Sequence, residues 1–139
     1  MAERVTKDLS VIHNPATEHE EDISDLLKGI KKDPFPSQGE IIKACCKSLL
    51  SGNKAAYITA ECGTGKTIQA IGCAHVLHEL NRTKRVLVLC PPTIVKKWIT
   101  EIKECLPSAK AYNFNGKDII KQLEILRRQP KPTCLVFSV

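Results

Sequence analysis

The sequence of 139 residues predicts an α/β domain with three layers and a mainly parallel sheet. Segments of strand type and of helical type alternate from residue 55 onward, which is typical of βα units. Residues 85–90 are almost all apolar, as expected of a strand that is buried on both faces of a parallel sheet. A loop with two glycines joins the first predicted strand to a predicted helix. These three observations favour a βα alternation over an all-helical or all-β fold.

The N-terminal residues 1–33 are predicted to form an acidic, flexible arm. They hold few apolar residues, and acidic residues gather between Glu18 and Asp22. One short helix is expected near Ile23–Gly29. The domain itself is predicted to cover residues 34–139.

A helix is predicted to begin directly after the run Asp33-Pro34-Phe35-Pro36, which interrupts helical structure. The next four residues, Ser37-Gln38-Gly39-Glu40, have the Ser-x-x-Glu form of a capping box. Ser51-Gly52-Asn53 should end this helix. Its apolar stripe is predicted to comprise Ile41, Ile42, Cys45, Leu49 and Leu50.

The remaining elements follow one another with short connections. Strands are predicted at Ala55–Ala60, Arg85–Cys90, Ala109–Phe114 and Thr133–Val139, and helices at Thr67–Leu80, Thr93–Cys105 and Asp118–Gln129. The helix after the glycine-containing loop is expected to bury a stripe made of Ala70, Cys73, Ala74, Leu77 and Leu80.

Composition excludes several classes of protein. With 42% hydrophobic residues the chain can form one globular core. Its apolar runs, such as Val86–Cys90, are far shorter than the roughly 20 residues of a membrane helix, and no apolar core of a signal peptide follows Met1. Seven cysteines lie scattered in apolar runs and lack the short spacings of a metal site. Reduced thiols in a cytoplasmic protein without membrane contact are therefore expected.

The charge is distributed unevenly along the chain. Residues 1–40 carry 5 Lys or Arg against 9 Asp or Glu, whereas residues 41–139 carry 16 against 6. A basic body favours polyanionic partners, of which nucleic acid is one.

The segment with the most specific chemistry is Ala60-Glu61-Cys62-Gly63-Thr64-Gly65-Lys66-Thr67, hereafter the glycine loop. Glycine permits backbone conformations in which consecutive N–H groups converge on a phosphate. Lys66 adds a cation, the Thr67 hydroxyl is a candidate Mg²⁺ ligand, and the start of the following helix favours negative charge. The glycine loop therefore predicts a nucleotide-phosphate site that binds ATP with Mg²⁺.

The glycine loop resembles motif I of superfamily 2 helicases and translocases, the DEAD/DEAH-like ATPases, whose usual form is Ala-x-x-Gly-x-Gly-Lys-Thr. Gln38, which lies 28 residues before Lys66, is similar to the adenine-reading glutamine of their Q motif. The run from Val86 to Ile102 resembles motif Ia of the Swi/Snf-like branch, in which a strand ends in proline and the next helix carries a tryptophan. Leu135–Val139 is similar to the strand that leads to motif Ib. The resemblance covers about residues 34–139 and implies the N-terminal part of a first RecA-like lobe.

The resemblance also implies roles for single residues. Gln38, Glu61, Cys62, Gly63, Thr64, Gly65, Lys66 and Thr67 would bind nucleotide, with Lys66 in the catalytic role and Thr67 at the metal. In the family the strand ends of motifs Ia and Ib face nucleic acid, so Thr93, Lys96 and Ser138 are candidates for phosphate contacts, with DNA the favoured partner. Lys96 can equally serve only to solubilise its helix. His75 is expected on a solvated face rather than at a metal.

The family pairs motif I with a downstream Asp-Glu motif that completes Mg²⁺ binding and positions the attacking water. No adjacent Asp-Glu pair follows Thr67 here. The expectation is the ATP-binding portion of a DNA-dependent ATPase, incomplete at the C-terminus, which does not hydrolyse ATP unless a second polypeptide supplies the missing motifs. The alternative is a nonhydrolysing binding remnant or subunit. A small P-loop kinase is less favoured, because no acceptor-binding or lid segment is evident.

Overall fold

The computed structural model describes residues 20–114, 120, 121, 124, 127 and 133–138. The chain divides into two compact units. The first, called the helical unit, consists of Met1–Gly29 and Asp33–Val76, and the second, called the sheet unit, consists of Ile30–Lys32 and Leu77–Val139. Each is described by itself.

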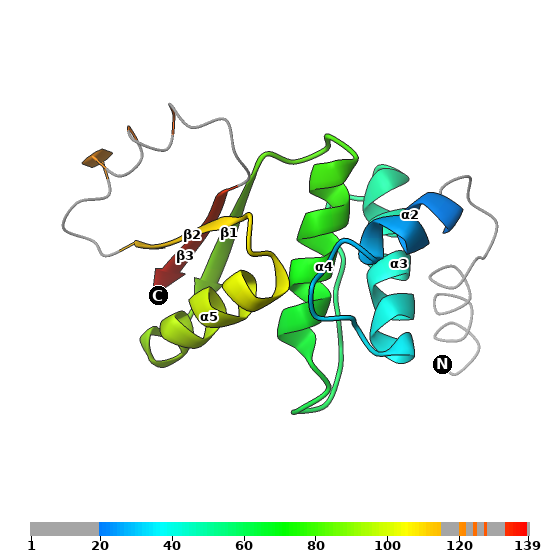
Figure 1. The fold of residues 1–139 in the computed structure, drawn as a ribbon, viewed down its shortest axis with the longest axis horizontal. Coiled ribbons are helices and arrows are strands. Elements are labelled where there is room, and N and C mark those ends of the chain that lie inside the picture. Colours follow the sequence, from blue (N-terminus) through cyan, green and yellow to red (C-terminus); the bar gives the residue numbers. More distant parts are fainter. Residues whose placement is uncertain (1–19, 115–119, 122–123, 125–126, 128–132, 139) are drawn as a thin grey trace, which may run out of the picture. The chain divides into compact units, whose positions relative to one another are not determined.

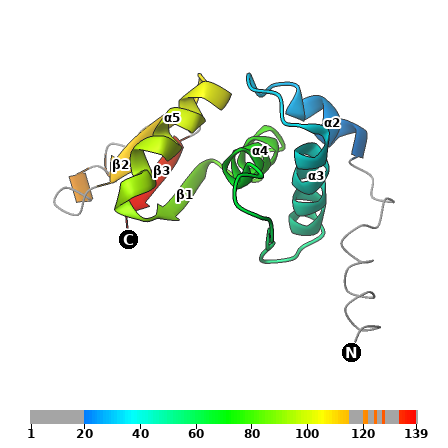
Figure 2. The ribbon, with the colours of Figure 1, turned by 90° about the horizontal axis from the view of Figure 1, so that it is seen from below.

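The helical unit contains α2 (Glu20–Leu27), α3 (Pro36–Leu50) and most of α4 (Lys66–Glu79). Figures 1 and 2 show α3 beside both α2 and α4. The buried apolar side chains of this unit come from all three helices and are Ile23, Leu27, Ile42, Cys46, Ile68, Ile71 and Val76. The short helix expected near Ile23–Gly29 is present as α2. Its two buried side chains, one turn apart, form its inner face.

The start of α3 differs from the sequence prediction. The predicted capping box at Ser37 and Glu40 is wrong, because the helix already begins at Pro36 and Phe35 is its N-cap residue. Proline suits the first helical position, where its missing N–H leaves no hydrogen bond unmade. The backbone N–H of Phe35 donates a hydrogen bond of 3.0 Å to the Oε1 atom of Gln38, so the Gln38 side chain caps the N-terminus of α3.

The buried face of α4 also differs from the predicted stripe. The buried residues are Ile68, Gln69, Ile71, Gly72 and Val76, whereas Ala70 is exposed. The predicted stripe of Ala70, Cys73, Ala74, Leu77 and Leu80 is therefore wrong. A pattern of apolar residues gives no signal for the burial of Gln69, because that residue is polar.

The predicted strand Ala55–Ala60 is not formed. Its residues belong to no strand, pair with none of the described strands, and leave Tyr57 94% exposed. A strand requires a neighbouring backbone to accept and donate its hydrogen bonds. The local apolar pattern of these six residues does not provide one.

The sheet unit contains β1 (Arg85–Cys90), the 3₁₀ turn η1 (Pro92–Ile94), α5 (Val95–Cys105), β2 (Lys110–Phe114) and β3 (Thr133–Ser138). The strand order is β1-β3-β2, and β3 pairs in parallel with both neighbours. Figures 1 and 2 show α5 alongside this sheet. Val95, Ile102 and Cys105 are its buried residues.

The prediction that β1 is buried on both faces is wrong. Leu87 and Leu89 are 57% and 65% exposed, and Val86 and Val88 are partly buried. Side chains of a strand alternate between its two faces, so one apolar face of β1 is exposed. In the described part of the sheet unit, α5 lies beside the strands (Figures 1 and 2).

Two further predictions are only partly covered by the described residues. Ile120, Lys121, Glu124 and Arg127 have helical backbone, but the rest of the predicted helix Asp118–Gln129 lies outside them, as does most of the arm, residues 1–19. Within the described part of the chain, no helix has both the length and the apolar character needed to cross a membrane.

Candidate nucleotide-binding site

The glycine loop leads directly into α4, which begins at Lys66. Gly63 and Gly65 have φ angles of 86° and 82°. This left-handed region strongly favours glycine. At Gly65 space is limiting as well, because a Cβ atom there would collide with the Nε2 atom of Gln38 and would lie 3.2 Å from Ile68. The loop geometry therefore requires glycine at position 65 for two independent reasons.

Gln38 links the start of α3 to the glycine loop. It is 9% exposed, its Nε2 atom donates to the Thr64 carbonyl oxygen over 2.9 Å, and its Oε1 atom accepts from the Phe35 N–H. The structure thus brings this residue of the predicted site into contact with the loop, although 26 residues separate it from Thr64.

Gln69 is a residue of this region that the sequence analysis missed. It is 1% exposed, and its Nε2 atom donates to the same Thr64 carbonyl over 3.3 Å. Its Oε1 atom is buried without a hydrogen-bond partner among the described residues. A signal was available in the sequence, because Gln69 lies one helical turn after Gly65 and so faces the loop.

Lys66 is exposed, and its ammonium group donates to the carbonyl oxygens of Ala60 and Glu61 over 2.9 and 2.8 Å. The Thr64 hydroxyl donates to the same Glu61 carbonyl over 2.9 Å. These bonds fold the loop around the ammonium group. An anion in the loop would meet this positive charge together with the unpaired N–H groups at the start of α4.

The residues of the glycine loop fit a phosphate chain. The loop supplies N–H donors and positive charge from two left-handed glycines, an exposed lysine and the start of a 14-residue helix. Among the described residues, Lys66 is bonded to carbonyl oxygens and not to a carboxylate. For Mg²⁺ the chain offers one hydroxyl at Thr67, and the described residues contain no group of three His, Cys, Asp or Glu side chains suited to a metal. The remaining ligands of a magnesium ion would be phosphate oxygens and water.

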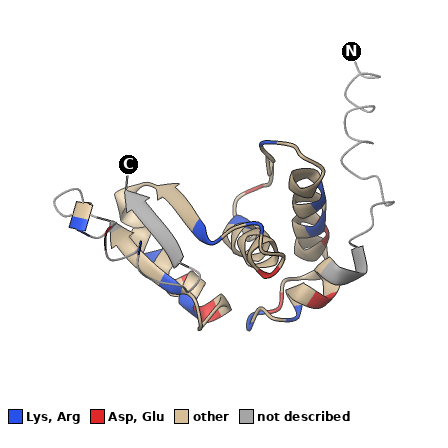
Figure 3. Ribbon diagram, turned by 90° about the horizontal axis from the view of Figure 1, so that it is seen from above, with Lys and Arg blue, Asp and Glu red and all other residues tan. Residues whose placement is uncertain are grey.

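The three candidates for nucleic-acid contact all lie in the sheet unit, at the carboxyl ends of its strands. Thr93 is exposed in η1, directly after β1, and Lys96 is exposed in the first turn of α5. Ser138 ends β3 and is the parallel partner of Cys90, the last residue of β1. Two further lysines, Lys97 and Lys103, follow along α5, which also carries Glu101 and Glu104 (Figure 3). One edge of the sheet therefore carries all three positions.

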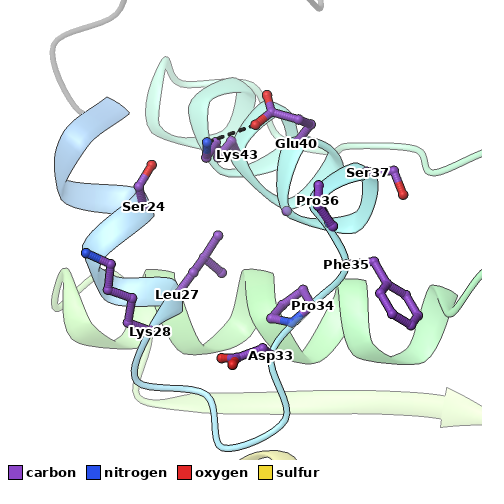
Figure 4. A pocket seen from close by; sticks show the side chains of 11 residues that line it. Ser24, Leu27, Lys28, Asp33, Pro34, Phe35, Pro36, Ser37, Glu40 and Lys43 are labelled. Carbon is purple, nitrogen blue, oxygen red and sulfur yellow. Dashed lines mark hydrogen bonds and ion pairs between the residues drawn. The ribbon is translucent and has the colours of Figure 1, made fainter.

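The helical unit also contains a cavity of about 530 Å³ between α2 and α3. Figure 4 shows Leu27, Pro34 and Pro36 along it, with the ion pair of Lys43 and Glu40, 2.9 Å long, at its edge. No residue of the glycine loop lines this cavity, so the cavity is separate from that loop.

Three thiols meet where α3 contacts α4. The Cys46 and Cys73 thiols approach the carbonyl oxygens of Cys73 and Ile42 at 4.0 and 3.9 Å. A hydrogen bond with Cys73 and burial raise the pKa of Cys45 above its usual range. The pKa of Cys73 is about 12, because its hydrogen bond with Cys45, which lowers it, is outweighed by the bond with Cys46 and by burial. These thiols are free, as is the exposed Cys62 of the glycine loop.

The prediction that His75 lies on a solvated face is wrong. This residue is partly buried, and its Nε2 atom lies 3.2 Å from the Leu26 carbonyl oxygen. This contact joins α4 to the C-terminal end of α2.

Residues 31–137 match the family described as type III restriction enzyme, res subunit. The chain is 29% identical over 125 residues to the chromatin-remodeling ATPase INO80 of Arabidopsis thaliana, an alignment that covers 87% of this chain and 8% of that protein. It is 23% identical over 103 residues to the DNA excision repair protein ERCC-6-like of Danio rerio, covering 74% of this chain and 7% of the relative. The chain thus spans less than a tenth of the length of these relatives.

Among solved structures, the Sulfolobus solfataricus SWI2/SNF2 ATPase core in complex with dsDNA has the same fold. Its TM-score is 0.64 at 20% sequence identity, over 78% of this chain and 22% of that chain. The fold is therefore that of part of a RecA-like ATPase core. Because the family match spans most of the sequence, the chain belongs to the type III restriction enzyme res-subunit family, and it is similar to the N-terminal portion of a superfamily 2 helicase domain of the Swi/Snf-like branch.

Proposed function

We propose that this chain is the ATP-binding portion of a DNA-dependent ATPase of the helicase or translocase type. The observation that carries the proposal is the glycine loop itself, with two left-handed glycines, an exposed lysine and the start of α4 in one continuous segment. The domain would have the three-layer, mainly parallel RecA-like arrangement of 34–139. The parallel pairing of β3 with β1 and β2 supports this.

The backbone and two side chains of the glycine loop would have different tasks in nucleotide binding. The backbone from Glu61 to Gly65, including Cys62 and Thr64, would surround the phosphates with N–H groups. Lys66 would exchange its bonds to the Ala60 and Glu61 carbonyls for phosphate oxygens, which are stronger acceptors because they are charged. The Thr67 hydroxyl would hold Mg²⁺, which when bound neutralises charge between the terminal phosphates. Gln38 would read the adenine.

The edge formed by Thr93, Lys96 and Ser138 would contact the phosphates of DNA. Both side chains described at this edge, those of Thr93 and Lys96, are exposed. The chain carries a net charge of +6, and the Sulfolobus solfataricus SWI2/SNF2 ATPase core, which shares its fold, was solved in complex with dsDNA. Contacts of this kind position a protein on DNA without selecting a sequence.

The 139 residues alone are proposed to bind ATP without hydrolysing it at a useful rate. Phosphoryl transfer depends on positioned charges and a positioned water, and no Asp-Glu pair follows Thr67 in the sequence. A second polypeptide segment that supplies these groups would restore hydrolysis. A permanently nonhydrolysing binding subunit is the alternative. The names of the two relatives refer to chromatin and DNA repair, so a compartment that contains DNA is favoured over the cytoplasmic location expected from the thiols.

The test is a pair of measurements on the chain and its Lys66→Ala variant. A fluorescent ATP analogue with Mg²⁺ should bind the wild-type chain and bind the variant at least tenfold more weakly, because a charge-assisted bond to phosphate is lost. Phosphate release with ATP, Mg²⁺ and dsDNA should be absent for both. Equal binding by both proteins would contradict the phosphate site, and release by the wild type alone would contradict the proposed lack of hydrolysis.

A further inference from the structure

Gln69 combines deep burial with an incomplete set of hydrogen bonds. It is 1% exposed, and its Oε1 atom has no partner in the described part of the chain. A buried amide oxygen without a partner loses its hydration and gains nothing in return. An apolar side chain of similar length would avoid this cost. The other half of the Gln69 amide, its Nε2 group, is therefore expected to make an interaction that compensates this cost.

Gln69 contacts the glycine loop through its side-chain amide and also through its backbone N–H. The Gln69 Nε2 atom donates to the Thr64 carbonyl over 3.3 Å, and the Gln69 backbone N–H donates to the next carbonyl, that of Gly65, over 3.2 Å. Two consecutive carbonyl groups of the loop are thus bonded to one residue of α4. The Gln38 amide, which comes from α3, adds a second donor to Thr64 at 2.9 Å.

Holding the Thr64 carbonyl also determines where the next N–H group points. The peptide between Thr64 and Gly65 is planar and trans, so its C=O and N–H bonds point in opposite directions. Amides bonded to the Thr64 oxygen therefore turn the Gly65 N–H away from α3 and from the side chain of Gln69. That is the side on which the glycine loop can offer N–H groups to an anion.

We infer that Gln69 is a positioning residue of the glycine loop, which keeps the Thr64–Gly65 peptide in the orientation that a bound phosphate chain requires. The inference rests on the proposed nucleotide binding and adds to it a residue that touches no ligand itself. Packing alone would favour an apolar side chain at this position. The glutamine places an amide donor next to the loop, and it does so at the cost of an Oε1 atom that has no partner among the described residues.

The test uses Gln69→Met in the full chain, because methionine has a similar length and no hydrogen-bond donor. The matched control is Ala70→Met, which places the same side chain at the next, exposed position of α4. Three quantities are compared with the wild type: the affinity for a fluorescent ADP analogue and for competing pyrophosphate, the thermal unfolding temperature, and the hydrogen–deuterium exchange rate of backbone amides 60–66.

Loss of one neutral hydrogen bond predicts about three- to tenfold weaker binding of ADP in Gln69→Met. Pyrophosphate binding should weaken by the same factor, since the effect acts on the phosphate seat and not on adenine. The unfolding temperature should stay equal or rise, because the unpaired oxygen is removed, and exchange in the loop should accelerate. Ala70→Met should leave all three quantities unchanged.

Two results would overturn the inference. The first is that Gln69→Met changes neither the affinity for ADP nor the exchange rate of the loop amides. The second is that its affinity and its unfolding temperature fall together, because the loss of binding would then follow from general destabilisation. Failure of the proposed function looks different, since the wild-type chain would then bind neither ADP nor pyrophosphate. In that case, faster hydrogen–deuterium exchange of amides 60–66 in Gln69→Met would still show that Gln69 holds the loop, and unchanged exchange would show that it does not.

Discussion

The amide of Gln38 donates a hydrogen bond of 2.9 Å to the carbonyl oxygen of Thr64, so the first turn of α3 is tied to the glycine loop. Because the same side chain accepts from the Phe35 N–H, both ends of its amide are engaged within the protein. Gln38 therefore acts on the shape of the loop in addition to any contact with a base.

These two roles of Gln38 can be separated by the choice of nucleotide. If Gln38 reads adenine, Gln38→Met should reduce ATP affinity more than GTP affinity, by about tenfold for a bond that is lost next to a buried partner. If it serves only the loop, both affinities should fall equally. Competition titrations with ATP and GTP measure the ratio, and an unchanged affinity for both would contradict either role.

Substitution of the second loop glycine is expected to destabilise the helical unit. Gly65→Ala forces a side chain into the left-handed region and against the Gln38 amide, which should reduce the free energy of unfolding by about 1–3 kcal/mol. Urea unfolding followed by circular dichroism measures the change.

Gly39→Ala is the matched control for this substitution. Gly39 lies inside α3, where an added Cβ meets no atom within 4 Å, so alanine should stabilise by about 0.5–1 kcal/mol through the lower entropy of the unfolded chain. Destabilisation of similar size in both variants would show that the loop geometry is not responsible.

The proposed DNA edge predicts different effects for two adjacent lysines of α5. Lys96→Ala should weaken binding to dsDNA and lower the slope of log affinity against log salt by about 1, as expected when one phosphate contact is lost. Lys97 is the control, since its ammonium group lies 3.8 Å from Glu101 on the same helix. Fluorescence anisotropy over a series of salt concentrations gives both slopes. Equal slopes for the two variants would mean that only the overall charge matters.

The thiols between α3 and α4 predict a loss of stability at high pH. An unfolded cysteine ionises near pH 8.5, whereas Cys73 has a pKa of about 12 in the folded chain. The folded state therefore binds the proton more tightly, and the free energy of unfolding should be constant below about pH 8 and decrease between about pH 9 and 12. Urea unfolding at pH 7, 9 and 10 measures this decrease, which should be smaller in Cys73→Ala. An identical decrease in that variant would assign the effect to other groups.

Local sequence signals were sufficient to predict those elements whose conformation depends on one short segment of the chain. The strand Arg85–Cys90 was found as predicted, because a run of five apolar residues, Val86–Cys90, lies between a charged turn and two prolines. The glycine loop could be located for the same reason, since all its residues are contiguous and its conformation depends on two glycines. The helix starting near Pro36 was also recognised, but its capping residue was assigned wrongly.

The remaining errors involve contacts between distant segments. Ala55–Ala60 has the composition of a strand and no described partner, and a strand cannot form without one. The apolar stripe of α4 was misplaced because a buried glutamine was not anticipated. Gln69 is buried by its contact with the loop, and a polar residue gives no apolar signal.

The amino-acid sequence on its own determined the glycine loop proposed to bind phosphate, the glutamine upstream of it and the basic charge of residues 41–139, because these features depend on local backbone preference and charge. The folded structure alone decided which groups support that loop. Two amides from different helices meet at one carbonyl oxygen, that of Thr64. Hydrogen bonds of this kind depend on distances of about 3 Å between atoms far apart along the chain, and such distances are set only when helices pack.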